Sequence, residues 1–348
     1  MVTVALLTVG DHRWTAFLDA APHDFHHLPG YVDLSGRHQG GRGAALYATD
    51  GDRQLLLPLV IRDIATGGGD AVSPYGYPGP LVLGTDDPAF MVRALAEGIR
   101  LLRDEGLISM FVRLHPLLNR ALPDGIGTLV RHGETVSVDL SQSVEALWHD
   151  TRPRYRTAIN QSIRAGYVPR VDNDDTGFDA FKGLYRATMI RKSAAEFYMF
   201  DDTYFDRLRD ALGERLVIGV VELDGVVAAA AMFVETCGIV QYHLSGTDER
   251  FATHAPTRLL HHFFIRWARE RGDRWLHLGG GRGGANDSLM QYKAGFSSGR
   301  TPFYTLRVVL DEQAYARSVA ARDPSLDASD RSGYFPLYRS DPVMAAVQ

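Results

Sequence analysis

Residues 275–296 combine a strand-like run, a glycine-rich loop and a short amphipathic helix in the sequence WLHLGGGRGGANDSLMQYKAGF. Five of the six residues at 279–284 are glycine, and the helix expected after them carries Lys293. The chain has only three lysines, Lys182, Lys192 and Lys293, and every other residue among its 37 lysines and arginines is arginine. Lysine supplies a compact ammonium with rotatable donors, whereas arginine supplies a rigid fork. A lysine in this position therefore indicates that a compact ammonium is needed there.

The same loop matches the dinucleotide-binding fingerprint as Gly279-x-Gly281-x-x-Gly284. That fingerprint opens a βαβ unit of about 30 residues, and an acidic residue follows roughly 20 residues on, at the next strand end. Here the loop lies near the C-terminus and precedes a helix of only about eight residues, so the match is weak support for a nucleotide cofactor. Two interpretations remain open, a purely structural turn and the wall of an active site.

Length and composition are those of a soluble globular protein with room for two domains, at 348 residues, 45% hydrophobic and 23% charged. The chain has no apolar run of about 18 residues, so no transmembrane helix is expected. Its N-terminus lacks the features of a secretory signal, which predicts a cytoplasmic location. The net charge of −5 argues against a protein that coats nucleic acid, but a local basic patch would still allow contact with one end of an RNA.

The sequence shows no pattern that is typical of a disulfide, a metal site or a serine hydrolase. Cys237 is the single cysteine, which excludes an internal disulfide and a cysteine-based metal site, and its place between two strands predicts a packed thiol. The 13 histidines include the neighbouring pairs His26-His27 and His261-His262, but none combines helical spacing with a third ligand nearby. We therefore predict no metal site. The absence of a Gly-x-Ser-x-Gly elbow argues against serine-hydrolase chemistry.

Secondary-structure signals recur in the same order in both halves: a helix, two strands joined by an Asp-Gly turn, a third strand, a helix and a strand. The turns are Asp50-Gly51 and Asp224-Gly225. This order predicts an α/β fold with two similar domains, each a mixed, largely antiparallel sheet flanked by helices. The expected boundaries are an N-terminal domain at 1–150, a C-terminal catalytic domain at 151–315, and a tail at 316–348 that either folds back on a domain or stays loose.

Several short motifs, in this order, resemble the FemABX-like branch of the GNAT acyltransferase superfamily. They are FHHLPGY at 25–31, SPYGYPGP at 73–80, the basic helix 154–164 with Ala165-Gly166, Asp224-Gly225, YHLSGT at 242–247, HLGGG at 277–281, DSL at 287–289 and KAGF at 293–296. The resemblance covers roughly residues 14–315. It implies two GNAT-like domains and aminoacyl transfer from an aminoacyl-tRNA to an amine. The implied acceptor is a cell-wall, natural-product or polysaccharide precursor, and the chain departs from the cell-wall subgroup because it has no long heptad segment for a coiled-coil arm.

The segment Gly246–Pro256 bears on the identity of the donor. Acetyl-CoA enzymes of this superfamily hold the pyrophosphate on backbone N–H groups of a glycine-rich turn that precedes a helix. Here the segment reads GTDERFATHAP, with one early glycine, two acidic residues and bulky side chains. A pyrophosphate would meet carboxylates at this turn. We therefore expect aminoacyl-tRNA as co-substrate, rather than coenzyme A, and no cofactor.

Lys293 and Tyr242 are the expected catalytic residues. The family position of Lys293 is implied to be active, and its ammonium would stabilise the oxyanion that forms when an amine attacks an aminoacyl ester. Tyr242 would hydrogen-bond the donor ester or relay a proton, and the structural alternative is a core aromatic in a central strand. His243 alternates with Tyr242 along the strand, so at most one of the two side chains is expected to line the substrate cleft.

The other expected site residues bind substrate or phosphate. Tyr75 and Tyr77 would form a wall for the acceptor, or else belong to a rigid structural loop. Arg191 resembles a family position implied to hold the acceptor's phosphate or carboxylate. A basic set would contact phosphates of the RNA end or of the acceptor, or else form a solvated helix face: Arg152, Arg154, Arg156 and Arg164. Asp287 is expected to cap the helix of Lys293.

These inferences favour an aminoacyltransferase in which the acceptor amine attacks the ester carbonyl directly, without an enzyme-bound acyl group. The expected partners are the acceptor end of an aminoacyl-tRNA and a small-molecule amine. Two alternatives stay open, an acyl-CoA-dependent N-acyltransferase and a non-catalytic GNAT-like protein that binds a small molecule.

Overall fold

The computed structural model describes residues 1–119, 125–172 and 174–340, and the chain divides into two compact units. Unit 1 comprises residues 1–133 and those from 302 onward, and unit 2 comprises residues 134–301. The chain passes between the units within two strands, β7 (Thr128–Asp139) and β13 (Arg300–Val309). The expected boundaries at 150 and 315 are thus displaced to 133 and 301. The sequence pattern of a strand does not show which of its residues belong to unit 1 and which belong to unit 2.

Unit 1 is a mixed sheet with flanking helices. Its further elements are β1 (Thr3–Thr8), α1 (His12–Ala20), α2 (Pro29–His38), β2 (Arg42–Asp50), β3 (Arg53–Asp63), β4 (Gly69–Val72), β5 (Leu81–Leu83), α3 (Pro88–Asp104), β6 (Leu107–Arg113) and α10 (Glu312–Arg322). The strand order is β1-β2-β3-β4-β6-β13, with β5 beside β3. Strands β4 and β6 run parallel, and the other pairs are antiparallel.

The core of unit 1 follows the two-residue period of its strands. On β2, Ala44 and Leu46 pack with the residues of α3, whereas Ala45 packs with those of α1 and α2. The C-terminal segment adds α10, and Tyr338 donates a hydrogen bond to Asp70 at 3.1 Å. The tail therefore folds back on unit 1 as far as residue 340, and residues 341–348 lie outside the described part of the chain.

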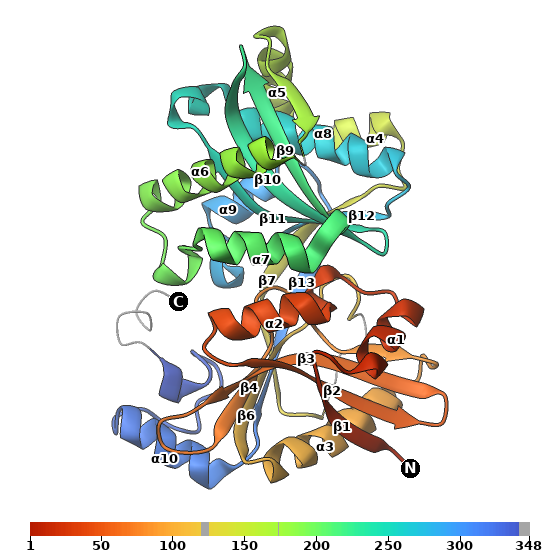
Figure 1. Cartoon of the computed structure of the whole chain (residues 1–348), viewed down its shortest axis with the longest axis vertical. Coiled ribbons are helices and arrows are strands. Elements are labelled where there is room, and N and C mark those ends of the chain that lie inside the picture. The colour runs from red at the N-terminus through yellow and green to blue at the C-terminus, as the bar shows by residue number, and fades with distance from the viewer. Residues whose placement is uncertain (120–124, 173, 341–348) are drawn as a thin grey trace. The chain divides into compact units, whose positions relative to one another are not determined.

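Unit 2 repeats this plan (Figure 1). Its elements are α4 (Val144–Asp150), α5 (Pro153–Arg164), β8 (Val168–Val171), α6 (Asp175–Arg191), α7 (Asp202–Leu212), β9 (Leu216–Leu223), β10 (Val226–Thr236), β11 (Ile239–Thr247), α8 (Pro256–Glu270), β12 (Trp275–Gly279) and α9 (Ser288–Lys293). The strand order is β7-β12-β11-β10-β9-β8, and β11 and β12 are the parallel pair. The predicted α/β fold, with a largely antiparallel sheet flanked by helices in each half, is confirmed. None of the helices among the described residues is long and apolar enough to cross a membrane.

Tight turns join the antiparallel strands of unit 2. Asp224 and Gly225 link β9 to β10 with φ values of 50° and 78°, and Cys237 and Gly238 link β10 to β11 with 46° and 76°. Two consecutive positive φ values are what a type I′ hairpin turn requires. The Asp-Gly signal was therefore sufficient to predict its hairpin. The prediction of a packed thiol is wrong, because Cys237 lies in a turn and is exposed.

Helices α8 and α6 each pack closely against a glycine of this sheet. A Cβ built on Gly219 of β9 would lie 2.1 Å from the ring of Phe264 on α8. A Cβ on Gly246 of β11 would lie 2.2 Å from the backbone of Leu184 on α6. Gly246, the one early glycine of the segment 246–256, thus allows the close approach of α6 to the sheet.

We expect the substitution Gly246→Ala to lower the free energy of unfolding by about 1–3 kcal/mol, because the new methyl group would displace helix backbone. Gly183→Ala is the matched control on α6, since a Cβ there meets no atom within 4 Å. Helix propensity predicts that the control raises stability by about 0.5–1 kcal/mol. Urea denaturation of the two variants measures both effects, and equal stability of the two would disprove the contact.

Candidate active site

The parallel strands β11 and β12 pair over only part of their length. The paired residues are Ile239–Gln241 and Trp275–His277. A buried hydrogen bond of 2.8 Å between His277 Nδ1 and Gln241 Oε1 lies at the end of this register. Beyond it, β11 continues through Tyr242 to Thr247, while β12 ends at Gly279 and enters the glycine-rich loop. Tyr242 is therefore the first residue of β11 past the paired segment.

The glycine-rich loop has a conformation that side chains would obstruct. Gly279 and Gly283 adopt φ values of 74° and 58°, and a Cβ on Gly281 would lie 2.0 Å from the carbonyl oxygen of Ala285. Asp287 then caps α9 by accepting a hydrogen bond of 2.9 Å from the N–H of Met290, and it also binds Arg282 Nε at 3.1 Å. The predicted capping role of Asp287 is confirmed. The loop and the cap together set the position at which α9 begins.

Lys293 is the last residue of α9, and it is buried, with 8% of its surface exposed. Its Nζ donates a hydrogen bond of 2.7 Å to the carbonyl oxygen of Gly280 in the glycine-rich loop. Burial lowers the pKa of Lys293 to about 8, and the negative charge of Asp287 partly opposes this shift. Lys293 is therefore not an ordinary surface lysine, because its ammonium is desolvated inside unit 2.

Tyr242 lies beside Lys293, with the ammonium nitrogen 6.0 Å from the centre of the phenol ring. The hydroxyl groups of Tyr242 and Ser245 are 2.5 Å apart. Burial raises the pKa of Tyr242, so the phenol keeps its proton at neutral pH. The structure thus brings together the two residues predicted to be catalytic, a cation and a neutral hydroxyl.

His261 of α8 completes this cluster and was not selected from the sequence. Its ring centre is 4.5 Å from that of Tyr242 and 4.7 Å from that of Phe296. Its Nδ1 donates to the carbonyl oxygen of Thr257 at 2.8 Å, and burial lowers its pKa to about 4, so the imidazole is neutral. Among the described residues, its buried Nε2 has no hydrogen-bond partner. In the sequence, His261 belongs to the apolar stripe of α8 and cannot be distinguished from its core neighbours.

His243 lies where the pairing of β10 with β11 shifts register. Phe233 pairs with Tyr242, whereas Met232 pairs with Leu244, so His243 is the extra residue of a β-bulge. A bulge interrupts the two-residue alternation of side chains. His243 and Tyr242 therefore need not face opposite sides of the sheet at this position.

The predicted basic residues fall into two groups. Arg152 and Arg156 are half-buried and donate to backbone carbonyl oxygens, those of Gln291 on α9 and Trp148 on α4, respectively. Arg154 and Arg164 are exposed. Arg191 donates to the carbonyl oxygen of Thr247 at 3.2 Å, at the far end of β11 from the paired segment. Phosphate binding by these residues stays a prediction.

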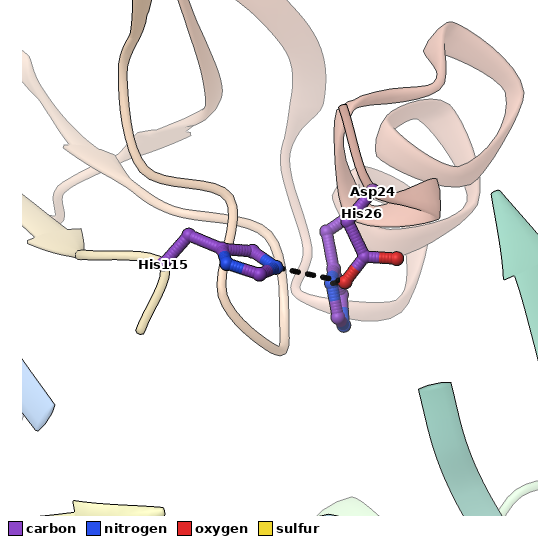
Figure 2. Close-up of side chains that lie close together, drawn as sticks. All are labelled: Asp24, His26 and His115. Atoms are coloured by element: carbon purple, nitrogen blue, oxygen red, sulfur yellow. Dashed lines mark hydrogen bonds and ion pairs between the residues drawn. The ribbon is translucent and has the colours of Figure 1, made fainter. Parts of the chain in front are cut away.

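In unit 1, a buried cluster links three side chains that are distant in sequence (Figure 2). Asp24 Oδ2 accepts hydrogen bonds of 3.0 Å from both His26 Nδ1 and His115 Nε2. His115 Nδ1 accepts from the N–H groups of Leu117 and Leu118, so the ring proton is on Nε2. The ligand atoms of the three side chains lie within 4.8 Å of one another, and hydrogen bonds to Asp24 join them in this structure. The expectation of no metal site stays a prediction.

The same cluster positions the loop of Tyr75 and Tyr77. Tyr77 packs edge-on against the rings of His26 and His115, at centroid distances of 5.9 and 6.3 Å. The hydroxyl of Tyr31 donates to the carbonyl oxygen of Tyr75 at 2.8 Å. These contacts support the structural interpretation of the loop. Both tyrosines belong to unit 1, whereas Lys293 and Tyr242 belong to unit 2.

Comparisons with known proteins agree with this architecture. The family described as an acetyltransferase (GNAT) domain matches residues 149–294. The solved structure of FemX superposes with a TM-score of 0.67 at 12% identity, covering 89% of this chain and 98% of FemX. The chain has a FemX-like tandem GNAT fold. This confirms, for the fold, the resemblance drawn from the sequence motifs.

Two further solved structures are similar to this FemX-like chain. L-PGS from Bacillus licheniformis has a TM-score of 0.58 at 15% identity, with 86% of this chain and 92% of that chain covered. A tandem GNAT protein from the clavulanic acid biosynthesis pathway has a TM-score of 0.50 at 14% identity, with 88% and 98% covered. No curated protein matches the sequence. The residues that match the GNAT family model include Tyr242 and Lys293.

The segment before α8 in this GNAT-type unit has no glycine-rich turn. Residues Glu249–His254 form a short 3₁₀ helix, preceded by Asp248, which forms an ion pair of 2.6 Å with Arg250. Ala255 then adopts a left-handed conformation at φ 52°, and Pro256 is the first residue of α8. Proline has no N–H group, so the start of α8 offers one donor fewer to a pyrophosphate. This geometry supports the argument made from the sequence against coenzyme A.

Proposed function

We propose that this protein transfers the aminoacyl group of an aminoacyl-tRNA to an amine acceptor and forms an amide bond. The observation that carries the proposal is the buried ammonium of Lys293, held by Gly280 beside Tyr242 at the point where β11 and β12 cease to pair. A desolvated cation at such a point is suited to stabilise negative charge that develops during acyl transfer. The FemX-like fold and the GNAT family match of unit 2 support the acyl-transfer class.

In the proposed reaction the neutral amine attacks the carbonyl carbon of the aminoacyl ester. A C–N bond forms, and the carbonyl oxygen becomes an oxyanion that the Lys293 ammonium stabilises. The C–O bond to the terminal ribose then breaks, and the proton lost by the amine is transferred to the ribose oxygen. Holding the two substrates together contributes about 7–11 kcal/mol of the barrier reduction in well-oriented cases. In this proposal Tyr242, whose pKa burial raises, donates a hydrogen bond to the same oxygen.

Exposed arginines of α5 support an RNA end as the donor. Arg154 and Arg164 are exposed, and Arg152 of the same segment contacts α9, the helix of Lys293. The acceptor is proposed to be a small-molecule amine from a cell-wall, natural-product or polysaccharide precursor.

An acyl-CoA-dependent N-acyltransferase is the second candidate, because the matching family is described as an acetyltransferase domain. The acidic segment before α8 and the proline that begins α8 argue against it. We expect calorimetry of the full chain to show no coenzyme A binding tighter than roughly millimolar.

The decisive experiment incubates the full chain with a pool of charged tRNAs and candidate amines. We expect an amide product whose formation is abolished by prior RNase treatment. Micromolar coenzyme A binding together with turnover of an acyl-CoA would replace this proposal with the second candidate. Absence of both activities, with retained binding of a small amine, would instead indicate a non-catalytic protein.

A further inference from the structure

Arg258 lies in the first turn of α8 and is half-buried. Its guanidinium carbon is 4.4 Å from the centre of the Tyr155 ring on α5. Of its three side-chain nitrogens only Nε is buried without a partner, so the two terminal nitrogens are open to solvent. Neither of them has a hydrogen-bond acceptor or a carboxylate partner in the described part of the chain. Arg258 thus presents free donors at the surface of unit 2.

Tyr155 holds this guanidinium in place. The Tyr155 side chain is buried, and its hydroxyl donates to the carbonyl oxygen of Tyr292 on α9 at 3.1 Å. A Cβ on Gly295, just after α9, would lie 2.0 Å from the Tyr155 ring. A guanidinium that stacks on a fixed aromatic ring loses little further freedom when it binds a ligand. Arg258 is therefore preorganised by a side chain that packs directly on the helix of Lys293.

The charge of Arg258 also acts on α9. Burial raises the pKa of Tyr292 well above its ordinary value, and the positive charge of Arg258 is one of the effects that oppose this shift. Tyr292 directly precedes Lys293 in the chain. Arg258 is thus a second cation near the proposed reaction centre, supplied by a different helix.

The neighbouring surface carries further arginines that no carboxylate neutralises. Arg154 of α5 also stacks on Tyr155, with its guanidinium carbon 5.4 Å from the ring centre, and Arg164 is exposed on the same helix. The ion pairs of the segments that flank this surface involve other arginines, namely Asp248 with Arg250 and Glu270 with Arg266. Neither Arg154, Arg164 nor Arg258 forms an ion pair with a residue that the structure describes.

We propose that Arg258 binds a phosphate of the donor, namely a phosphodiester near the aminoacylated end of the RNA. A guanidinium fork matches two phosphate oxygens and forms charge-assisted hydrogen bonds with them. This inference rests on the proposed function, because it assigns a residue to the donor of that reaction. Coenzyme A carries phosphate groups of the same chemistry, so the experiment has to distinguish the two donors.

Binding of a single-stranded RNA that ends in CCA, as tRNAs do, tests the proposal by fluorescence anisotropy on the full chain. We expect Arg258→Gln to weaken this binding at least about tenfold, the usual scale for losing a charge-assisted hydrogen bond. The slope of log affinity against log salt should also fall by about 0.7, the value for one phosphate contact of a single strand. Arg258→Lys should restore the slope, because it restores the charge.

Arg266→Gln is the matched control, since Arg266 is exposed farther along α8 and pairs with Glu270. It should bind the RNA like the unaltered protein. Thermal unfolding separates the proposed role of Arg258 from a structural one. If Arg258 only covers Tyr155, Arg258→Gln will lower the melting temperature and leave the RNA affinity and the salt slope unchanged, which would overturn the proposal.

A parallel titration with coenzyme A separates this inference from the proposed function. Binding of coenzyme A that depends on Arg258, without binding of the RNA, would support the phosphate contact and overturn the RNA donor. Normal RNA binding by Arg258→Gln, with amide formation intact, would overturn the role of Arg258 and leave the proposed function standing. Binding of neither probe to the unaltered protein would overturn both.

Discussion

Replacing Lys293 with methionine is expected to lower turnover at least about a hundredfold, the usual scale for the loss of one oxyanion donor. Methionine keeps the length and most of the packing of the lysine stem but removes the charge. The buried position of Lys293 and its hydrogen bond to Gly280 hold the ammonium at one place, so the variant loses a positive charge at that place. Steady-state turnover at saturating donor and acceptor measures this effect.

Two further variants test whether activity requires an ammonium at this position or only a positive charge. Lys293→Arg should restore little activity, because a forked guanidinium does not fit the site of a compact ammonium. Lys192→Met is the matched control, since Lys192 is exposed at the end of α6. It should retain full turnover. Near-full turnover of Lys293→Met would show that Lys293 is not catalytic, and Tyr242 would become the leading candidate for oxyanion stabilisation.

The second large effect is the loss of turnover that we expect as pH rises above the pKa of Lys293. Because burial lowers the pKa of Lys293 to about 8, the ammonium is present below that pH and is lost above it. If the ammonium stabilises the oxyanion, turnover at saturating substrates should fall about tenfold per pH unit above about pH 8. Lys293→Arg is the control, because its guanidinium stays charged and its residual activity should lack this descending limb. A wild-type profile that keeps rising through pH 9 or so would contradict the assignment.

The same pKa makes an independent prediction for stability. The folded pKa of about 8 is below the ordinary lysine value of 10.5, so the unfolded chain binds more protons between these two values. Stability should therefore rise with pH across this window, by about 3 kcal/mol for this group. Lys293→Met lacks the titrating group. The difference in unfolding free energy between wild type and Lys293→Met should shift in favour of wild type between about pH 8 and 10.5.

Local sequence signals were enough for most secondary structure. The Asp224-Gly225 turn predicted its hairpin because only a few residue types tolerate two consecutive positive φ values. Helical periodicity placed the basic helix at 154–164, where α5 lies, because its apolar face is read directly from residues close in sequence. Short strands such as β4 and β8 were missed, since four residues carry no clear period.

The candidate site, too, was predicted in part from the sequence and decided in part by the tertiary structure. The rarity of lysine and the glycine-rich loop identified Lys293, and the helix that follows needed only the local cap of Asp287. Its burial, its lowered pKa and its proximity to Tyr242 depend on packing between β11, α8 and α9. His261 could not be identified from the sequence, because a histidine within an apolar helix stripe is indistinguishable from any other core residue there.

The sequence by itself determined the strand–loop–helix of residues 275–296, the hairpins and the absence of a disulfide, because each depends on residue types within a few positions of one another. Only the tertiary structure decided which buried charges lack partners. Asp24 meets His115 across 91 positions, whereas Arg307 reaches no carboxylate within ion-pair distance in the described chain. The electrostatic free energy of a buried group depends on its desolvation and on its neighbours in space, and sequence separation carries almost no information about either.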